Sequence, residues 1–255
     1  MSITKIGIRF GAKLPRIESF KRFLFVGPHP DDIEIGAGAT IKRLADEGKN
    51  IAFLICTDGR YGDGFVGTDV SREELIAMRK EESIASAKYL GVSDVRFLDL
   101  SDGAFYQEEE LLKGIIATIS DFKPDIIFGP DYFVASETHP DHLRVGNAVK
   151  TAAFIAPYQG IMEQYGAEPA DVQAVAYYMT AKPNRYVKTK GLKDQLRALK
   201  LHKSQYPEGS NDYDSIKLYL TLRNIDASIR TMHFGAEGFR VLGKTHMHCL
   251  PEAGL

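Results

Sequence analysis

Four short apolar runs punctuate the first half of the chain, and each is followed by a longer stretch with helical character. The runs are 23–28, 51–57, 95–100 and 125–130. Runs this short and this apolar are typical of strands that are buried on both faces, as in parallel sheets covered by helices. The alternation therefore predicts right-handed βαβ units and a Rossmann-like α/β fold whose sheet is mostly parallel and flanked by helices.

Helices are expected between and after these strands. Ser71 is followed three residues later by Glu74, and this spacing predicts a capping box at the start of a helix. The other helix limits rest on apolar periodicity and on glycine or proline punctuation. The expected helices run from about 37 to 48, from 71 to about 90, from about 108 to 122, and from after His142 to about 156.

The chain beyond residue 157 has a different pattern. A loop with Gly160, Gly166 and Pro169 comes first, and a strand-like run follows at 174–181. Helical stretches are expected near 192–204 and 213–231. No linker-like composition separates this region from the preceding one. We therefore expect one domain over residues 1–255, with a Rossmann-like core at about 21–156 and a C-terminal α/β extension at 157–255.

Composition excludes several classes of function. The 255 residues include 32 Lys plus Arg and 34 Asp plus Glu, for a formal charge of -2, which argues against nucleic-acid or membrane-surface binding. No apolar run approaches the roughly 20 residues that span a bilayer, and the N-terminus lacks the features of a signal peptide. Cys56 and Cys249 are far apart, without metal-ligand spacing. We expect a buried thiol at Cys56, no disulfide framework and a cytoplasmic protein.

The tripeptide His-Pro-Asp occurs twice, and each copy is followed by a second side chain that can bind a metal. The first copy is His29-Pro30-Asp31-Asp32 and the second is His139-Pro140-Asp141-His142. Each follows a predicted strand, and ligands of open α/β sheets bind at the carboxyl ends of strands. Proline fixes its own φ and favours an extended preceding residue, so each His is expected at a strand-to-helix corner. Both motifs would meet in one crevice if their strands are close in the sheet.

These residue types predict a hydrolytic metal centre. Catalytic zinc sites have three N or O ligands from the protein and one open position, and the ion lowers the pKa of a water to about 7. Two His and one Asp satisfy that count, and a remaining carboxylate can act as general base. The remaining His can stabilise an oxyanion or protonate a leaving amine, and Asp141 can orient an imidazole. Spacing alone does not assign these roles. Helix capping by Asp31 or Asp32, and a surface pair of His139 and His142, are the plainer alternatives.

The paired motifs resemble those of the LmbE-like (PIG-L) family of zinc-dependent N-acetylglucosaminide deacetylases. The likeness extends from about Phe23 to Pro251. Further matches lie at Thr57–Gly59, at Arg79–Ser83, at 177–207 and at Ala236–Arg240. The last two are most similar to the archaeal diacetylchitobiose deacetylases within the family. The resemblance implies a Rossmann-like fold and removal of acetyl from the 2-amino group of a GlcNAc-type sugar, with diacetylchitobiose or GlcNAc as expected substrates.

The resemblance also implies a role for each motif residue. It implies that His29, Asp32 and His142 bind Zn²⁺ and that Asp31 is the general base. His139 would be the oxyanion stabiliser or acid, with Asp141 tuning it.

Three further residues match sugar-contacting positions of the family. Arg79 and Asp102 would contact the substrate, and His248 would reach the site of a neighbouring subunit, with His246 as its rival. A solvated tail histidine is the alternative for either of these two. Relatives in the chitobiose group imply a homo-oligomer, specifically a hexamer.

Other functions compete with this interpretation. A phosphoesterase could use the same motifs, but such enzymes often hold two metals, and the sequence offers few spare ligands for a second. A nucleotide-binding Rossmann protein is suggested by the run Gly36–Thr40, but Ile41 replaces the third glycine of the fingerprint. The acidic residues before this run would also repel a pyrophosphate. His202 and His233 have no acidic companion at ligand spacing and receive no role. Aromatic residues that could stack on a sugar or pack locally are Tyr61, Phe65, Tyr132 and Phe133.

Overall fold

The computed structural model describes residues 3–67, 69–248 and 250, and within these residues seven strands form one sheet. Cys249 and Pro251 lie outside the described residues. The strand order is β3-β2-β1-β4-β5-β7-β6. The strands are β1 (Arg22–Gly27), β2 (Asn50–Thr57), β3 (Asp94–Leu100), β4 (Ile126–Pro130), β5 (Ala174–Tyr178), β6 (Arg185–Lys188) and β7 (Ala236–Gly243).

The first five strands are parallel, and β7 is antiparallel to both of its neighbours. The predicted α/β class with a mostly parallel sheet is therefore confirmed. The sheet continues from β4 into β5 without a break, so the C-terminal region extends the sheet that the N-terminal region begins. That the whole chain is one domain stays a prediction.

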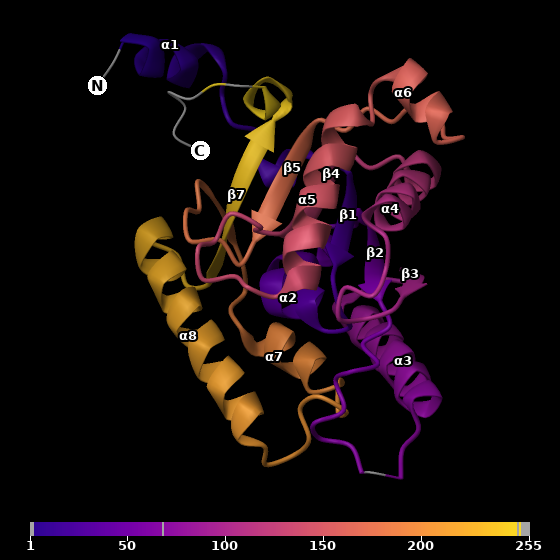
Figure 1. The fold of residues 1–255 in the computed structure, drawn as a ribbon. Coiled ribbons are helices and arrows are strands. Elements are labelled where there is room, and N and C mark those ends of the chain that lie inside the picture. Colours follow the sequence, from indigo (N-terminus) through magenta and orange to yellow (C-terminus); the bar gives the residue numbers. More distant parts are fainter. Residues whose placement is uncertain (1–2, 68, 249, 251–255) are drawn as a thin grey trace.

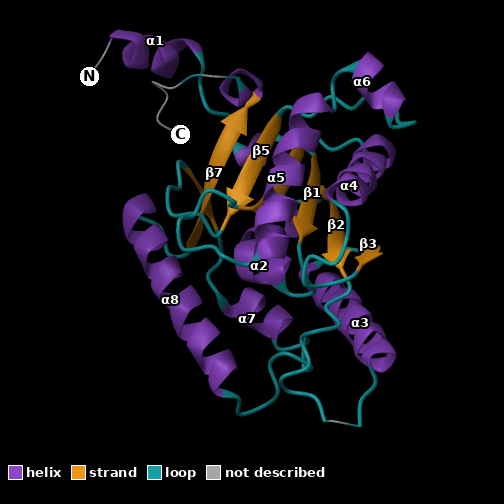
Figure 2. Cartoon of the chain, in the orientation of Figure 1, coloured by secondary structure: helices purple, strands orange, loops and turns teal. Residues whose placement is uncertain are grey.

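Helices cover both faces of this sheet (Figure 1, Figure 2). α4 and α5 pack on one face, and α2, α3 and α7 pack on the other. α8 lies at the β7 side of the molecule. The helices are α1 (Ile3–Gly11), α2 (Asp32–Asp46), α3 (Arg72–Leu90), α4 (Glu108–Phe122), α5 (Pro140–Ile155), α6 (Gln159–Gln164), α7 (Lys193–Leu199) and α8 (Asn211–Thr231). No helix of the described residues has the length and apolar content needed to cross a bilayer.

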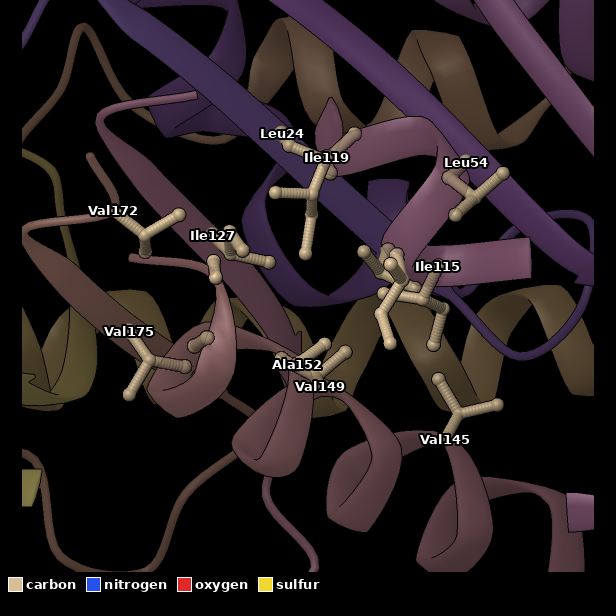
Figure 3. Close-up of a cluster of buried hydrophobic side chains, with 14 of the residues drawn as sticks. Leu24, Leu54, Ile115, Ile119, Ile127, Val145, Val149, Ala152, Val172 and Val175 are labelled. Atoms are coloured by element: carbon tan, nitrogen blue, oxygen red, sulfur yellow. The ribbon is translucent and has the colours of Figure 1, made fainter. Parts of the chain in front are cut away.

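Alternate residues of the central strands point to opposite faces of the sheet and belong to two separate hydrophobic cores. On β1, Leu24 faces α4 and α5, while Phe23 and Phe25 face α2 and α3. Figure 3 shows the first of these cores, where Leu24, Leu54 and Ile127 of the sheet meet apolar side chains of α4 and α5. A strand that is buried on both faces must be apolar throughout, which is the pattern seen in the sequence.

The predicted start of two helices is wrong. α2 begins at Asp32 rather than near Ala37, and α5 begins at Pro140 rather than after His142. Proline is favoured at the first helical position because its missing N–H has no partner there anyway. Both metal-motif sequences therefore run directly from a strand-to-helix corner into the first turn of a helix.

Glycines inside α2 obscured its start, because glycine lowers helix propensity. Packing explains their presence. A Cβ at Gly36 would lie 2.2 Å from the ring of Tyr178, and a Cβ at Gly38 would lie 2.8 Å from the side chain of Gln195. These small residues let α2 approach β5 and α7 closely, so the helix forms despite its glycines.

The C-terminal region departs most from prediction. β7, α1 and α6 were not predicted, and α6 occupies part of the expected loop before residue 169. β5 ends at Tyr178 rather than at 181, because Met179 adopts a left-handed backbone with φ of 54°. α7 is also shorter than the expected stretch of 192–204.

Candidate metal centre

The two His-Pro-Asp motifs meet at the carboxyl ends of β1 and β4. These strands are parallel neighbours in the centre of the sheet. The ring centroids of His29 and His142 are 5.3 Å apart, and that of His139 is 4.7 Å from His29 and 4.8 Å from His142. Three imidazoles from two distant segments of sequence therefore share one site, at the edge of the sheet where parallel α/β folds bind ligands.

Local backbone geometry sets the direction of each motif. Asp31 occupies the N-cap position of α2 with φ of 107°, but its side chain makes no capping hydrogen bond. A left-handed conformation is unfavourable for a residue other than glycine, and such positions cluster at functional sites. His139 is the N-cap of α5, and its Nδ1 accepts the backbone N–H of Asp141 at 3.3 Å. The capping alternative therefore does not explain the side chain of Asp31.

The donor atoms of His29, Asp32 and His142 fit a single tetrahedral ion. Asp32 Oδ2 lies 3.1 Å from His29 Nδ1 and 3.4 Å from His142 Nε2. Ligands at about 2.0–2.1 Å from a tetrahedral zinc are separated by about 3.3 Å. The three donor atoms all lie within 4.8 Å of one another. Two imidazoles and a carboxylate are a donor set that zinc accepts.

In both His29 and His142, the ring nitrogen that faces away from Asp32 lies beside a carboxylate. His142 Nδ1 lies 2.8 Å from Glu137 Oε2, which leaves Nε2 directed at Asp32. His29 Nε2 lies 3.1 Å from Asp102 Oδ1 and 3.3 Å from Asp141 Oδ2, which leaves Nδ1 directed at Asp32. Partners of this kind fix the tautomer and orientation of metal-binding histidines. Glu137 was not predicted as a site residue, although it lies only two residues before His139.

Asp31 and Asp32 are adjacent in sequence, but their surroundings move their pKa values apart. Burial raises the pKa of Asp31 to about 6, with Arg79 opposing the shift and the negative charge of Asp32 adding to it. Burial would also raise the pKa of Asp32, but His142 and His29 lower it well below its usual range. Such separation of paired carboxyl groups is typical of acid–base sites in which the two groups have different roles.

The structure brings Arg79 and Asp102 to this site. Arg79 is 3% exposed, so its side chain does not belong to a solvated face of α3. Its Nη1 and Nη2 donate to the carbonyls of Gly59 and Pro30, and Nη2 is 3.9 Å from Asp31 Oδ2. Arg79 thus ties two strand-end loops together beside Asp31. Asp102 accepts the N–H of Gly103 and faces His29.

Asp141 is fully buried, and its carboxylate lies beside two imidazoles. Its carboxylate accepts the backbone N–H groups of Gly103 and Ala104, and Oδ2 lies 3.7 Å from His139 Nδ1 as well as 3.3 Å from His29 Nε2. Because His139 Nδ1 already accepts the backbone N–H of Asp141, the Asp141 carboxylate can accept a ring proton only from His29 Nε2. That Asp141 tunes His139 stays a prediction.

The C-terminal histidines lie away from the site of their own chain. The 3-10 turn Lys244–Met247 follows β7, whose last residue pairs with the first residue of β5, at the opposite end of the sheet from the metal motifs. His248 is exposed and its ring contacts Phe154. His246 is buried, with Nε2 2.9 Å from the carbonyl of Ala12, so the solvated-tail interpretation is wrong for this residue.

Two further expectations need correction. His202 does have an acidic companion: its Nε2 lies 3.1 Å from Glu34 Oε1, and both residues are buried. The partners are far apart in sequence, so spacing could not reveal the pair. The site also has more spare donors than expected, because His29, Asp102, His139 and Asp141 form a second cluster. His29 belongs to both clusters, and its Nε2 already forms hydrogen bonds with Asp102 and Asp141.

A buried ion pair anchors the loop that carries the second motif. Asp131 directly follows β4, and Arg240 of β7 donates to it from Nε at 3.0 Å and from Nη2 at 2.5 Å. Both side chains are at most 5% exposed. Burial by itself would raise the pKa of Asp131, but Arg240 and Thr180 lower it below its usual range.

Asp131→Asn is expected to reduce the free energy of unfolding at pH 7 by about 3–5 kcal/mol, because it leaves the Arg240 charge buried and unpaired. The folded-state pKa of Asp131 is depressed, so its stabilisation is present above the unfolded pKa and is lost as pH falls below about 4. Urea unfolding at pH 7 and pH 3.5 measures both effects. Asp46→Asn removes a carboxylate from an exposed pair with Lys42 and should change stability by less than about 1 kcal/mol.

Comparison with known proteins agrees with this geometry. The sequence profile of the PIG-L family, described as GlcNAc-PI de-N-acetylase, matches residues 24–153. The chain is 35% identical to the diacetylchitobiose deacetylase of Thermococcus kodakarensis over 239 residues, which are 91% of this chain and 87% of that protein. The chain belongs to the PIG-L family. The profile match contains both His-Pro-Asp motifs, so the family assignment covers the whole candidate metal centre.

Other PIG-L relatives support the same fold. The N,N'-diacetylchitobiose deacetylase of Pyrococcus horikoshii, solved with its inhibitor MPG, superposes with a TM-score of 0.87 at 27% identity and covers 98% of this chain and 97% of that one. A 1D-myo-inositol 2-acetamido-2-deoxy-alpha-D-glucopyranoside deacetylase of Kineococcus radiotolerans is 30% identical over 69% of this chain and 56% of that protein. The matches to the Thermococcus kodakarensis and Pyrococcus horikoshii proteins extend through the C-terminal region as well as the Rossmann-like core.

Proposed function

We propose that this chain is a zinc-dependent deacetylase that hydrolyses the N-acetyl group of a GlcNAc-type amino sugar and releases acetate and a free amine. The observation that carries the proposal is the meeting of His29, Asp32 and His142 around one point while Asp31 stays outside this donor set. Diacetylchitobiose or GlcNAc is the proposed substrate, because two relatives that match more than nine-tenths of this chain are named as diacetylchitobiose deacetylases.

In this proposal His29 Nδ1, Asp32 Oδ2 and His142 Nε2 hold the ion. When bound, zinc polarises the amide carbonyl and lowers the pKa of water. Asp31, whose carboxyl has a raised pKa, takes the proton from the attacking water. Arg79, Asp102 and, from a neighbouring subunit, His248 are the proposed sugar contacts.

His139 is the proposed oxyanion stabiliser and acid. Because its Nδ1 accepts the N–H of Asp141, the neutral ring carries its proton on Nε2. That N–H can donate to the developing oxyanion. To act as the acid, the ring would first take up on Nδ1 the proton that Asp31 removes from the water, in place of the bond from the Asp141 N–H, and would then pass a proton from Nε2 to the leaving amine. The side chain of His139 is 44% exposed, so it remains accessible to a substrate that enters the crevice.

A phosphoesterase remains the second candidate, because the cluster of His29, Asp102, His139 and Asp141 is a geometric candidate for a second ion. Two-metal hydrolases hold their ions about 4 Å apart. The hydrogen bonds that Asp102 and Asp141 already accept from the backbone N–H groups of Gly103 and Ala104 favour the single-ion proposal.

A substrate panel tests the proposal. Zinc-loaded protein is incubated with GlcNAc, diacetylchitobiose and a GlcNAc-inositol conjugate, and with phosphomonoesters and phosphodiesters, and released acetate and phosphate are measured. We expect acetate from at least one N-acetyl sugar, one bound ion per chain and no phosphate. Phosphate release with two tightly bound ions and no acetate would replace the proposal with the second candidate.

The acidic side of the pH profile is expected to report Asp31. A general base must be ionised, so kcat/KM should fall as pH drops through the pKa of Asp31, which burial raises to about 6. Bound zinc is a nearby cation that favours the ionised carboxylate of Asp31, so it moves the midpoint of the fall in kcat/KM below pH 6 rather than above it. The measurement is kcat/KM from pH 4.5 to 8 with metal content checked at each pH. An acidic midpoint at pH 7 or higher in fully metal-loaded protein would remove Asp31 from this role.

Zinc as the native metal, a cytoplasmic location and a homo-oligomeric assembly belong to the same proposal. Imidazole and carboxylate donors suit zinc, although iron and cobalt accept similar sets. The free, fully buried thiol of Cys56 fits a reducing compartment. The relatives of the chitobiose group favour a hexamer.

A further inference from the structure

α8 exposes a row of large apolar side chains on the side that faces away from the rest of the chain. Leu218, Leu222, Ile225 and Ile229 are 61%, 57%, 49% and 72% exposed, and Met232 at the C-cap is 95% exposed. Exposed large apolar side chains that form one contiguous patch, rather than being scattered singly, mark an interaction site. We call these five residues the α8 stripe.

The α8 stripe follows the spacing of a coiled-coil seam. Its members are separated by four, three, four and three residues, which is the a/d pattern that presents a narrow apolar row to another helix. At 100° per residue, Leu220 and Ala227 lie on the opposite side of α8, and these are its buried residues. The helix thus packs one face against β6 and β7, and within the described residues no other helix covers its opposite face. Figure 1 shows α8 on the outside of the molecule, beside β7.

The flanking charges favour a second copy of this chain over a membrane. Helices that lie on membranes carry Lys and Arg along the border of their apolar face. Beside the α8 stripe, Arg223 and Arg230 alternate with Asp226, so both signs are present. The overall charge of the chain is -2. A bilayer with anionic lipids would gain little from such a border.

The same border is self-complementary in an antiparallel pair. If two copies of α8 cross at Ile225, Leu218 of one copy lies opposite Met232 of the other, and Leu222 lies opposite Ile229. On the polar border, Asp226 of one copy is then level with Arg223 of the other, twice by symmetry, while Asp226 also pairs with Arg230 of its own helix at 2.9 Å. Residues that meet their counterparts in this way define an isologous interface.

We propose that α8 pairs antiparallel with α8 of a second copy of this chain and buries the α8 stripe in a two-fold interface. This assigns a surface to the homo-oligomer of the proposed function, but it does not depend on the reaction. Contacts elsewhere on the chain would be needed to build any assembly larger than a dimer.

Ile225→Glu tests the interface, because two carboxylates would then face each other at the two-fold axis. Molar mass of the full chain is measured by light scattering and by sedimentation across a hundredfold range of concentration. We expect the variant to have half the mass of the wild type or less, with the same thermal unfolding temperature within a few degrees, since residue 225 is exposed in the single chain. Lys217→Glu, an exposed site of α8 outside the stripe, should keep the wild-type mass.

A monomeric wild-type protein at high concentration would overturn the proposal, as would an Ile225→Glu variant with unchanged mass. Ile225→Cys in a Cys249→Ser background adds a positional test, since it should form a disulfide-linked dimer under mild oxidation, and Lys217→Cys should not. Binding of wild-type protein to vesicles of anionic lipid, lost in Ile225→Glu without a change in mass, would assign the stripe to a membrane instead. Acetate release measured in the same samples keeps failure of the deacetylase proposal distinct from failure of this one.

Discussion

Asp31→Ala is expected to lower kcat by about 10²- to 10⁴-fold while the protein still binds one zinc ion per chain. The proposed ligands His29, Asp32 and His142 do not include Asp31, so we expect the ion to be retained. The proton of the attacking water would lose its acceptor, and the chemical step would slow. Initial rates of acetate release and metal content of the same preparation give both quantities.

Asp31→Asn separates loss of the base from backbone effects. Asp31 has φ of 107°, and asparagine tolerates left-handed backbone better than alanine does. Asp99→Asn is a matched control, because Asp99 also has positive φ, at 57°, but its carboxylate pairs with Lys80 outside the metal centre. We expect Asp31→Asn to resemble Asp31→Ala and Asp99→Asn to resemble the wild type. A near wild-type rate in both Asp31 variants would contradict the base assignment.

His142→Ala is expected to show the opposite pattern, with loss of the metal itself. Removing one of three protein ligands should weaken zinc affinity by well over about 100-fold, beyond the 10- to 100-fold typical of an outer partner. Activity should fall with it and recover in part when excess zinc is added. Zinc titration with a competing chelator, together with acetate release at each zinc concentration, measures the effect.

Glu137→Gln is the graded comparison for His142→Ala. Glu137 touches the far nitrogen of His142, so its loss should weaken zinc binding by about 10- to 100-fold and leave the donor set intact. Unchanged zinc affinity in His142→Ala would remove this residue from the ligand set. If zinc affinity fell in Asp31→Ala instead, Asp31 would be a zinc ligand, and the roles of Asp31 and Asp32 would have to be exchanged or shared.

Local signals in the sequence predicted the N-terminal core well. The capping box at Ser71 is present, with Ser71 Oγ accepting the N–H of Glu74 and the Glu74 carboxylate accepting the N–H of Ser71. α4 has its predicted limits of 108–122. The apolar runs of β1, β2 and β4 became strands that are buried on both faces, whereas the edge strand β3 is only partly buried and carries Arg96 and Asp99. These features depend on residues a few positions apart, which a single sequence displays directly.

The meeting of the residues of the candidate metal centre was predictable because each half of it is a contiguous motif. Each motif contains His and Asp side chains that can bind a metal. Ligands of α/β sheets bind at the carboxyl ends of strands, so the two motifs come together because β1 and β4 are neighbours. Glu137 was not predicted, because its reach to His142 depends on the path of the loop after β4. Glu34 and His202 were not predicted as a pair, because 168 positions separate them.

Features set by tertiary contacts were predicted least well. The start of α2 was misplaced because glycine at 36 and 38 signals a break locally, whereas Tyr178 and Gln195 require small residues there. β7 was missed because its partners β5 and β6 are remote in sequence and its run contains Gly238. The seam on α8 is visible as spacing in the sequence, but its outward direction follows only from the burial of the opposite face.

The position of the ion tests the central claim most directly. Crystals of zinc-loaded protein, with anomalous differences recorded on both sides of the zinc absorption edge, give the position and number of zinc ions. We predict one site per chain, within about 2.3 Å of His29 Nδ1, Asp32 and His142 Nε2, with Asp31 not coordinated. A site between Asp102, His139 and Asp141, coordination by Asp31, or no zinc at either cluster would contradict the account.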